Sequence, residues 1–224
     1  MRRDDELRRA HSHRHDPAVQ AIATGRRGDE RRGDLPLYQR ILGDAWRALP
    51  PAVRDLHDSV TTSTVVGRAR VERGDGALVS AVARVFGFPR AAHDIELRVI
   101  FTRRNGVETW RREFGDRAFT SVQYEGRGRY GGLLCERFGP FTFGLALVAN
   151  AGKLELVQRG WSFAGIPLPR AWAPHSTAFE AQAQRRFEFD VAIDLPLVGR
   201  LVRYTGWLEP TTAALSEASV QPDT

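Results

Sequence analysis

The stretch FEFDVAIDL, residues 187–195, decides the fold class of this 224-residue chain. Its apolar residues stand at every second position, with acidic residues or alanine between them. A period of two places one face of a β-strand against a protein core and the other face in water. The same alternation recurs through most of residues 62–208, which predicts a protein built around antiparallel strands.

About eight or nine strands are expected, each bounded by Gly, Pro or Asn, and Asn105-Gly106 marks a tight hairpin turn. The predicted strands cover residues 64–73, 95–101, 110–114, 119–124, 133–138, 141–149, 154–163, 179–195 and 201–208. A sheet of this size has to curl to hide its apolar face. We therefore expect a half-barrel rather than a flat layer.

Helix signals gather before the strands. Leu37 to Leu49 carries an apolar stripe at helical spacing, Pro51–His57 forms a second short helix, and Ala77–Phe86 forms a third. The third helix has Arg84 as its one charged residue, so it is expected to be buried or to cover an opening. The fold class is α+β, a large curved antiparallel sheet with N-terminal helices packed on it.

The ends of the chain differ from its middle. Residues 1–34 are charged and nearly without apolar residues, which predicts a disordered leader, and residues 211–224 read as a disordered tail. The folded unit is then one domain over residues 35–210. In the leader, His11, His13 and His15 alternate, but nothing there would hold them as metal ligands, so no metal site is expected.

Composition excludes several classes of protein. The net charge of +6 is spread along the chain, whereas a nucleic-acid-binding protein concentrates basic residues on one face. Cys135 is the only cysteine, so no intrachain disulfide can form. No apolar run is long enough to span a membrane, and the N-terminus lacks a signal core. We expect a cytoplasmic, soluble protein.

Two short motifs partly match the sequence patterns of known functional sites. Gly126–Gly131 matches the dinucleotide-binding pattern G-x-G-x-x-G, but a strand-length segment follows it where that motif needs a helix. Gly160–Ala164 resembles the nucleophile elbow of hydrolases but lacks the last glycine, and Ser162 lies within a strand. No cofactor is predicted from either motif.

Arginines at or near apolar positions are the more informative set. Arg159 is in phase with Trp161, Arg203 with Trp207, and Arg137 adjoins a Gly-Pro turn. An inward arginine either pairs with a buried carboxylate or faces a polar cavity, whereas a β-bulge would turn it outward. The inward alternative predicts a ligand pocket with an arginine for an anionic head group. Its candidate lining residues are Arg159, Arg203, Arg137, Trp161, Trp207, Trp110, Tyr204, His175, Phe143 and Phe189.

Several motifs resemble, in order, those of the bacterial domain-of-unknown-function family 4166, over essentially all of residues 35–210. They include Leu37-Tyr38 with Trp46, Gly67-Arg68-Ala69, Glu136–Pro140, Pro167–Arg170, Phe187–Ile193 with Pro196-Leu197, and Tyr204 with Gly206-Trp207-Leu208. The resemblance implies a domain found alone or attached behind NAD(P)-binding domains of the saccharopine-dehydrogenase-like kind. It implies no catalytic residues, and this chain has no Rossmann half of its own.

Three functions follow as hypotheses. The first is a non-enzymatic binding module for an apolar or amphipathic, lipid-like small molecule, with the helix Ala77–Phe86 as its cover. The second is an enzyme that transfers protons with His175 and a carboxylate such as Glu180 or Glu188. The third is an accessory domain that docks on a Rossmann-type NAD(P)-dependent reductase.

Overall fold

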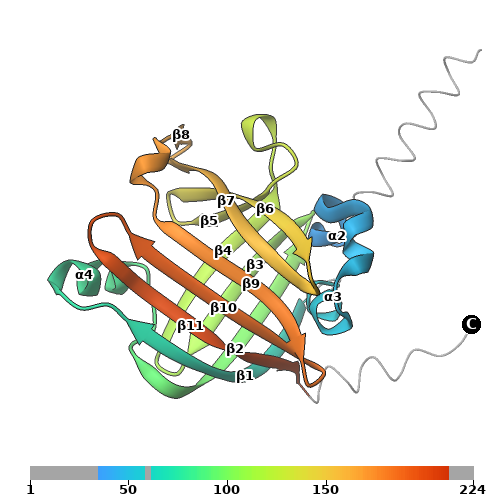
Figure 1. Cartoon of the computed structure of the whole chain (residues 1–224), viewed down its shortest axis with the longest axis horizontal. Helices are drawn as coiled ribbons and strands as arrows, with labels where there is room; N and C mark the ends of the chain where they lie inside the picture. The colour runs from blue at the N-terminus through green and yellow to red at the C-terminus, as the bar shows by residue number, and fades with distance from the viewer. Residues whose placement is uncertain (1–34, 59–61, 212–224) are drawn as a thin grey trace, which may run out of the picture. The chain divides into compact units, whose positions relative to one another are not determined.

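The structure is a computed structural model that describes residues 35–58 and 62–211 (Figure 1). The predicted leader with its three alternating histidines, and the predicted tail beyond Thr211, lie outside the described residues. Within the described residues, no helix is both long enough and apolar enough to cross a membrane.

Strands dominate the described chain. In chain order the elements are α2 (Leu37–Leu42), η1 (Gly43–Ala48), α3 (Pro51–His57), β1 (Thr62–Arg73), α4 (Ala77–Val85), β2 (Ala92–Arg104), β3 (Val107–Phe114), β4 (Arg117–Glu125), η2 (Gly128–Tyr130), β5 (Leu134–Phe138), β6 (Phe141–Asn150), β7 (Lys153–Phe163), β8 (Ile166–Pro167), η3 (Arg170–Trp172), β9 (His175–Ala183), β10 (Arg186–Leu195) and β11 (Gly199–Pro210). Each η element is a 3₁₀ helix. The predicted combination of a large antiparallel sheet with N-terminal helices is confirmed.

The sheet closes on itself. Its strand order is β6-β5-β4-β3-β2-β1-β11-β10-β9-β7, and β6 also pairs with β7, so these strands form a closed antiparallel barrel. The two-residue strand β8 pairs with the end of β7. The expectation of an open half-barrel with eight or nine strands is wrong, because the sheet is closed and the ring formed by the described residues contains ten strands. Closure satisfies the backbone hydrogen bonds that the edges of an open sheet would leave unpaired.

One predicted strand is in fact two. The segment 179–195 divides into β9 and β10, which pair with each other through a tight turn at Gln184 and Arg185. Both turn residues have positive φ angles, 48° and 69°, as a two-residue hairpin requires. Neither residue is Gly, Asn or Asp, so this turn carries no sequence signal.

Helices lie at both ends of the barrel (Figure 1). At the first end, here called the α3 end, α2 contacts β4 and β6, and α3 contacts β9 and β10. Leu37, Tyr38 and Val53 are fully buried there, because their helices turn an apolar stripe into the barrel. At the opposite end, here called the α4 end, α4 contacts β11 and buries Val79 and Ala83.

Candidate functional site

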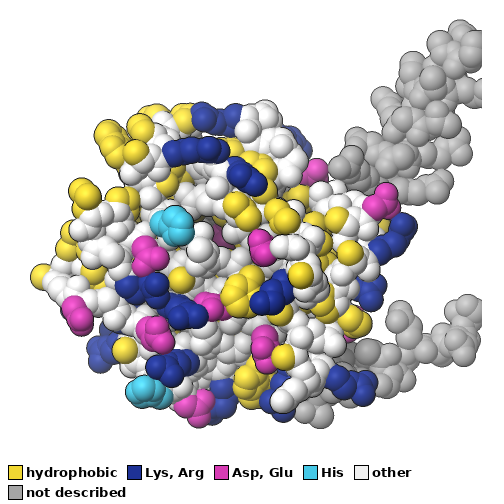
Figure 2. Space-filling model, viewed as in Figure 1, with side chains coloured by type: hydrophobic (Ala, Val, Ile, Leu, Met, Phe, Trp, Pro, Cys, Tyr) yellow, Lys and Arg dark blue, Asp and Glu magenta, His cyan; other side chains and the backbone are white. Residues whose placement is uncertain are grey.

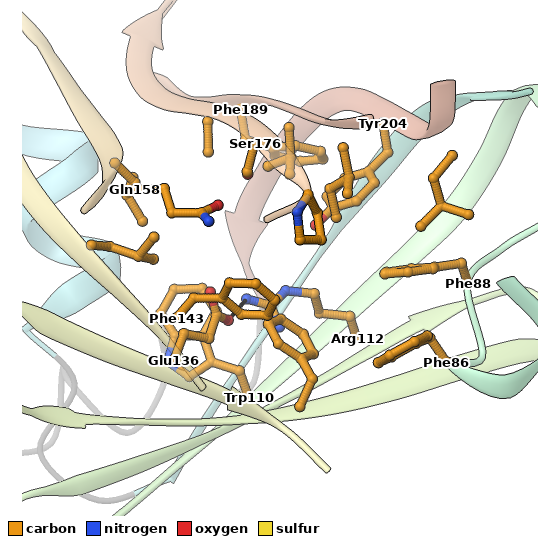
Figure 3. Close-up of a pocket in the computed structure, with 18 of the residues that line it drawn as sticks. Phe86, Phe88, Trp110, Arg112, Glu136, Phe143, Gln158, Ser176, Phe189 and Tyr204 are labelled. Carbon is orange, nitrogen blue, oxygen red and sulfur yellow. Dashed lines mark hydrogen bonds and ion pairs between the residues drawn. The ribbon is translucent and has the colours of Figure 1, made fainter. Parts of the chain in front are cut away.

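The barrel encloses a cavity of about 150 Å³ (Figure 3). Most of its wall is apolar, and its residues come from α2, α4 and eight of the barrel strands. The lining residues used below are Tyr38, Val82, Phe86, Phe88, Trp110, Arg112, Gln123, Glu136, Phe138, Phe143, Gln158, Ala178, Glu180, Phe189 and Tyr204. The alternation of inward and outward residues along each strand brings these side chains together from positions far apart in the chain.

Aromatic rings form much of the wall. Phe86 and Phe88, at and after the end of α4, stack with their centroids 5.9 Å apart. Phe189 and Tyr204, from β10 and β11, lie 6.1 Å apart on the wall between the two ends. Such rings supply a large apolar surface that a bound molecule could cover.

A polar cluster centred on Glu136 stands on the cavity wall. Arg112 donates a hydrogen bond to Glu136 Oε1 at 3.3 Å (Figure 3) and another to Ser121 Oγ at 2.9 Å. Ser121 and Gln123 donate to the same Oε1, at 2.7 and 3.1 Å. The Arg112 guanidinium also lies 4.9 Å from the centre of the Trp110 ring. Three donors thus hold one carboxylate oxygen, and no described residue donates to the other, Oε2.

The cluster continues to the α3 end of the barrel. The Tyr38 hydroxyl donates to Gln123 Oε1 at 3.0 Å, and the Tyr38 ring stacks on His57 at 3.6 Å. The Nε2 atom of His57 lies 2.6 Å from Oε2 of Glu180. These contacts connect α2 and α3 to the barrel interior through hydrogen bonds as well as apolar packing.

Burial changes the acidity of two tyrosines in the wall. Desolvation raises the pKa of Tyr204 to about 12. Desolvation also raises the pKa of Tyr38 well above its usual value, and the charges of Glu180, Glu136 and Glu108 add to that rise. Both hydroxyls therefore stay protonated and can donate hydrogen bonds at any physiological pH.

Gln158 supplies a further polar group. It lines the cavity from β7, and its Oε1 atom is buried with no hydrogen-bond partner among the described residues. A buried amide without a partner costs stability unless water or a ligand completes its hydrogen bonds. Gln158 and Glu136 are both positioned to meet a polar group inside the cavity.

The predicted inward arginines lie on the outside of the barrel. Arg159 is exposed, Arg137 is exposed, and Arg203 makes two hydrogen bonds to Asp190, at 3.0 and 2.7 Å, on the outer face. Arg137 and Arg203 follow the ordinary alternation of their strands, since their neighbours Glu136 and Tyr204 point inward and Arg203 shares the outer face with Trp207. A β-bulge turns Arg159 outward, and a second bulge separates Arg203 from the inward phase of Leu201. Arg159 is an extra residue in β7 between Gln158 and Gly160, and Leu201 is an extra residue in β11 between Arg200 and Val202. Each bulge shifts the alternation by one residue.

The predicted aromatic residues divide between two locations. Trp110, Tyr204, Phe143 and Phe189 line the cavity. Trp161 is buried beyond it, with its indole nitrogen donating to Pro169 O at 2.9 Å. Trp207 lies on the outer face, 4.4 Å from the Arg186 guanidinium.

The proposed proton-transfer pair does not form. His175 is exposed at the start of β9, and Glu188 is exposed on β10, whereas Glu180 is buried beside His57. His175 and Glu180 are five residues apart on one strand, so they point to opposite faces of the sheet. No group of His, Cys, Asp and Glu side chains among the described residues is arranged to hold a metal ion.

Sequence reasoning missed the polar cluster, although a signal for it was present. Arg112 is two positions from both Trp110 and Phe114, and Ser121 and Gln123 are two and four positions from Phe119. All three polar residues therefore share a strand face with buried aromatic residues. Polar residues in register with a core face on neighbouring strands indicate a buried polar network.

A groove of about 570 Å³ lies beside the cavity at the α4 end. It runs between α4 and the turn from β5 to β6, and Val82, Phe86 and Phe138 line both spaces. The side chains of these residues are therefore the wall between the cavity and the groove. Gly76 and Gly87, with φ angles of 100° and 71°, flank the helix that carries Val82.

One family model matches this chain. It is described as a domain of unknown function, DUF4166, and it covers residues 49–208, which include nearly all of the barrel and the cavity. No curated protein matches the chain.

Proposed function

This chain belongs to the DUF4166 family, whose function is unknown, and we propose from its own residues that it binds a small amphipathic molecule inside the barrel. The observation that carries the proposal is the cavity, an apolar chamber whose wall holds a carboxylate oxygen of Glu136 and the amide oxygen of Gln158, both without a protein donor among the described residues. Sites for small molecules typically combine an apolar wall with a few polar groups that fix orientation.

The size of the cavity limits the ligand. Apolar cavities of about 150 Å³ take up molecules of the size of benzene, whereas pockets for drug-sized ligands have about 300–1,000 Å³. The chamber alone therefore suits a small ring or a short chain. Movement of Phe86 or Val82 would join it to the groove and make room for a longer tail.

The polar groups favour a ligand whose head group donates hydrogen bonds. The Arg112 guanidinium already neighbours Glu136, and the carboxylate oxygen without a protein donor is an acceptor. The charged residues of the lining are two carboxylates, Glu136 and Glu180, and one guanidinium, Arg112. An amine or a hydroxyl complements this arrangement, whereas a carboxylate would meet repulsion from both glutamates.

Isothermal titration calorimetry with three probes of equal chain length tests the proposal. Octylamine and octan-1-ol should bind at pH 7, with the head group in the chamber and the tail extending into the groove once Phe86 or Val82 moves. Octanoate should bind at least about tenfold more weakly, since the carboxylates of Glu136 and Glu180 oppose it. Glu136→Gln should weaken octylamine binding more than octan-1-ol binding, because it removes the negative charge but keeps an acceptor. If octanoate bound most tightly, the assignment of the head group would be wrong, but the proposal that the cavity binds a small molecule would stand.

Filling the cavity tests whether the probes bind inside it. Ala178 lines the cavity from β9, so Ala178→Phe should abolish uptake. Ala146 alternates with the inward residues Leu145 and Leu147 of β6, so Ala146→Phe is the matched change on the outer face and should leave uptake intact. Absence of binding by all three probes, together with a bare polypeptide mass in native mass spectrometry of the purified protein, would overturn the proposed function.

A further inference from the structure

We propose that the α4 end of the barrel docks on anionic lipid bilayers. This inference rests on the surface of that end, and it does not depend on which molecule the cavity takes. Most of the large apolar side chains that are exposed among the described residues lie there. They form what we call the apolar rim: Leu78, Val85, Phe163, Ile166, Trp172 and Leu197.

The antiparallel topology brings the rim together from three separate parts of the chain. Leu78 and Val85 belong to α4, Phe163, Ile166 and Trp172 to the end of β7 with β8 and η3, and Leu197 to the turn between β10 and β11. The start of β11 pairs with the end of β1, just before α4, and the start of β9 pairs with the end of β10. Figure 2 shows hydrophobic side chains gathered at the end of the molecule where Figure 1 labels α4 and β8.

The rim residues are strongly exposed. Val85 is 82% exposed, Trp172 is 66% exposed and Ile166 is 65% exposed. Leu197 is fully exposed at a hairpin tip and has a φ of 63°, a conformation that a branched side chain seldom adopts. Exposed apolar side chains with a tryptophan among them suit insertion between lipid head groups.

The charges near the rim complement an anionic surface. Arg84, Arg137 and Arg170 are exposed at this end, and none of them forms an ion pair with another described residue. Among the acidic residues nearby, Asp116 and Asp194 are paired with Arg117 and Arg200, whereas Asp75, just before α4, is exposed and forms no ion pair with a described residue. The three unpaired arginines therefore outweigh one unpaired carboxylate. Each basic residue near an anionic membrane surface contributes about 1 kcal/mol to binding.

The groove lies on the side of the barrel that would face a docked bilayer. The groove opens beside α4, and Val85 belongs both to its lining and to the rim. A bilayer in contact with the rim would therefore face the groove that adjoins the cavity. An amphipathic molecule could then pass between bilayer and barrel with its apolar part shielded from water.

Vesicle co-sedimentation of the full chain tests the proposal, with phosphatidylcholine alone or mixed with phosphatidylglycerol. The protein should bind the mixed vesicles and be released by salt. Leu197→Asp combined with Ile166→Asp should lower the partition coefficient at least about tenfold, since two inserted apolar side chains are lost. The matched control is Val107→Asp, an exposed apolar residue at the α3 end, which should change binding less than about twofold.

Trp172 provides a second readout. Residues 1–34 are rich in arginine and could add to vesicle binding, but they contain no tryptophan and so cannot produce a fluorescence signal. Brominated lipids should quench the fluorescence of the bound protein, and Trp172→Phe should remove most of this quenching. Trp46, Trp110 and Trp161 are buried, and Trp207 lies in the part of β11 that is away from α4. Equal binding by the rim variant and the wild type, or no binding to either vesicle, would overturn the proposal. Loss of self-association or of a protein complex in the rim variant, without vesicle binding, would instead assign the rim to a protein partner.

Discussion

The Nε2 atom of His57 lies 2.6 Å from Oε2 of Glu180, 123 positions away in the chain, and this contact joins α3 to β9 inside the barrel. The imidazole of His57 has no exposed surface and stacks on the Tyr38 ring. A helix that closes one end of a barrel is thus held by a buried polar contact, which specifies its position more narrowly than apolar packing alone.

Removal of the Glu180 carboxylate should loosen this closure. Glu180→Ala leaves the ring nitrogen of His57 buried without a partner, which should lower the free energy of unfolding by about 2 kcal/mol. Urea denaturation followed by circular dichroism measures the change. Asp44→Ala is the control, because Asp44 pairs with Arg47 on the surface and its loss should cost less than about 0.5 kcal/mol. Equal effects of the two substitutions would contradict a structural role for the buried contact.

The pair of Arg112 and Glu136 should behave as a coupled unit. Glu136→Leu leaves a buried guanidinium without its carboxylate and should destabilise the protein by about 3 kcal/mol. Adding Arg112→Met should recover part of that loss, since neither charge then remains buried.

A double-mutant cycle in urea measures this coupling. Arg111→Ala, next to Arg112 but paired with Glu113 on the outer face, should change stability by less than about 0.5 kcal/mol. Strictly additive effects of Glu136→Leu and Arg112→Met would show that the two residues do not interact.

Stability should fall steeply at alkaline pH because of Tyr204. The unfolded chain releases the Tyr204 proton near pH 10, whereas the folded chain keeps it to about pH 12. The folded state binds more protons than the unfolded state in this window. The contribution of Tyr204 to the free energy of unfolding is therefore fully present below pH 10 and is lost as the pH rises towards 12. The full loss from this one residue is about 3 kcal/mol.

Tyr204→Phe isolates this contribution. The variant should show a flatter decline in the free energy of unfolding between pH 10 and 12 than the wild type. Denaturation curves at several pH values give both slopes. Parallel slopes for variant and wild type would mean that Tyr204 ionises as easily in the folded protein as in the unfolded chain.

Gly67 should not accept a side chain. A Cβ at this position would lie 1.9 Å from the backbone oxygen of Trp207, on the paired strand β11, and that backbone cannot move without breaking the barrel ladder. We expect Gly67→Ala to cost about 3 kcal/mol or to prevent folding.

Gly160→Ala is the control for Gly67→Ala. Its Cβ would meet the ring of Tyr130 at 3.2 Å, and a side chain can yield where a backbone cannot. Thermal denaturation should therefore show a smaller loss for Gly160→Ala than for Gly67→Ala. A larger loss at Gly160 would contradict the close approach of β1 and β11.

Most strands could be predicted from the sequence because alternation is a local property. The prediction for residues 95–101 corresponds to part of β2, and the apolar helix at residues 77–86 corresponds to α4. The division between β9 and β10 could not be predicted, because the turn at Gln184 and Arg185 is imposed by the pairing of its flanking strands. The family resemblance was also available from the sequence and is confirmed over residues 49–208.

By itself, then, the sequence determined the antiparallel strands, the helices before them and the family. The tertiary structure alone decided which side chains meet in the barrel. A bulge turns Arg159 outward, a bulge at Leu201 separates Arg203 from the inward phase, and Arg137 lies outside by ordinary alternation. Closure of the sheet brings Arg112 to Glu136 and His57 to Glu180. Alternation specifies only that neighbouring residues point to opposite faces. Which face is the interior depends on cross-strand register, and register is set by residues that are distant in the chain.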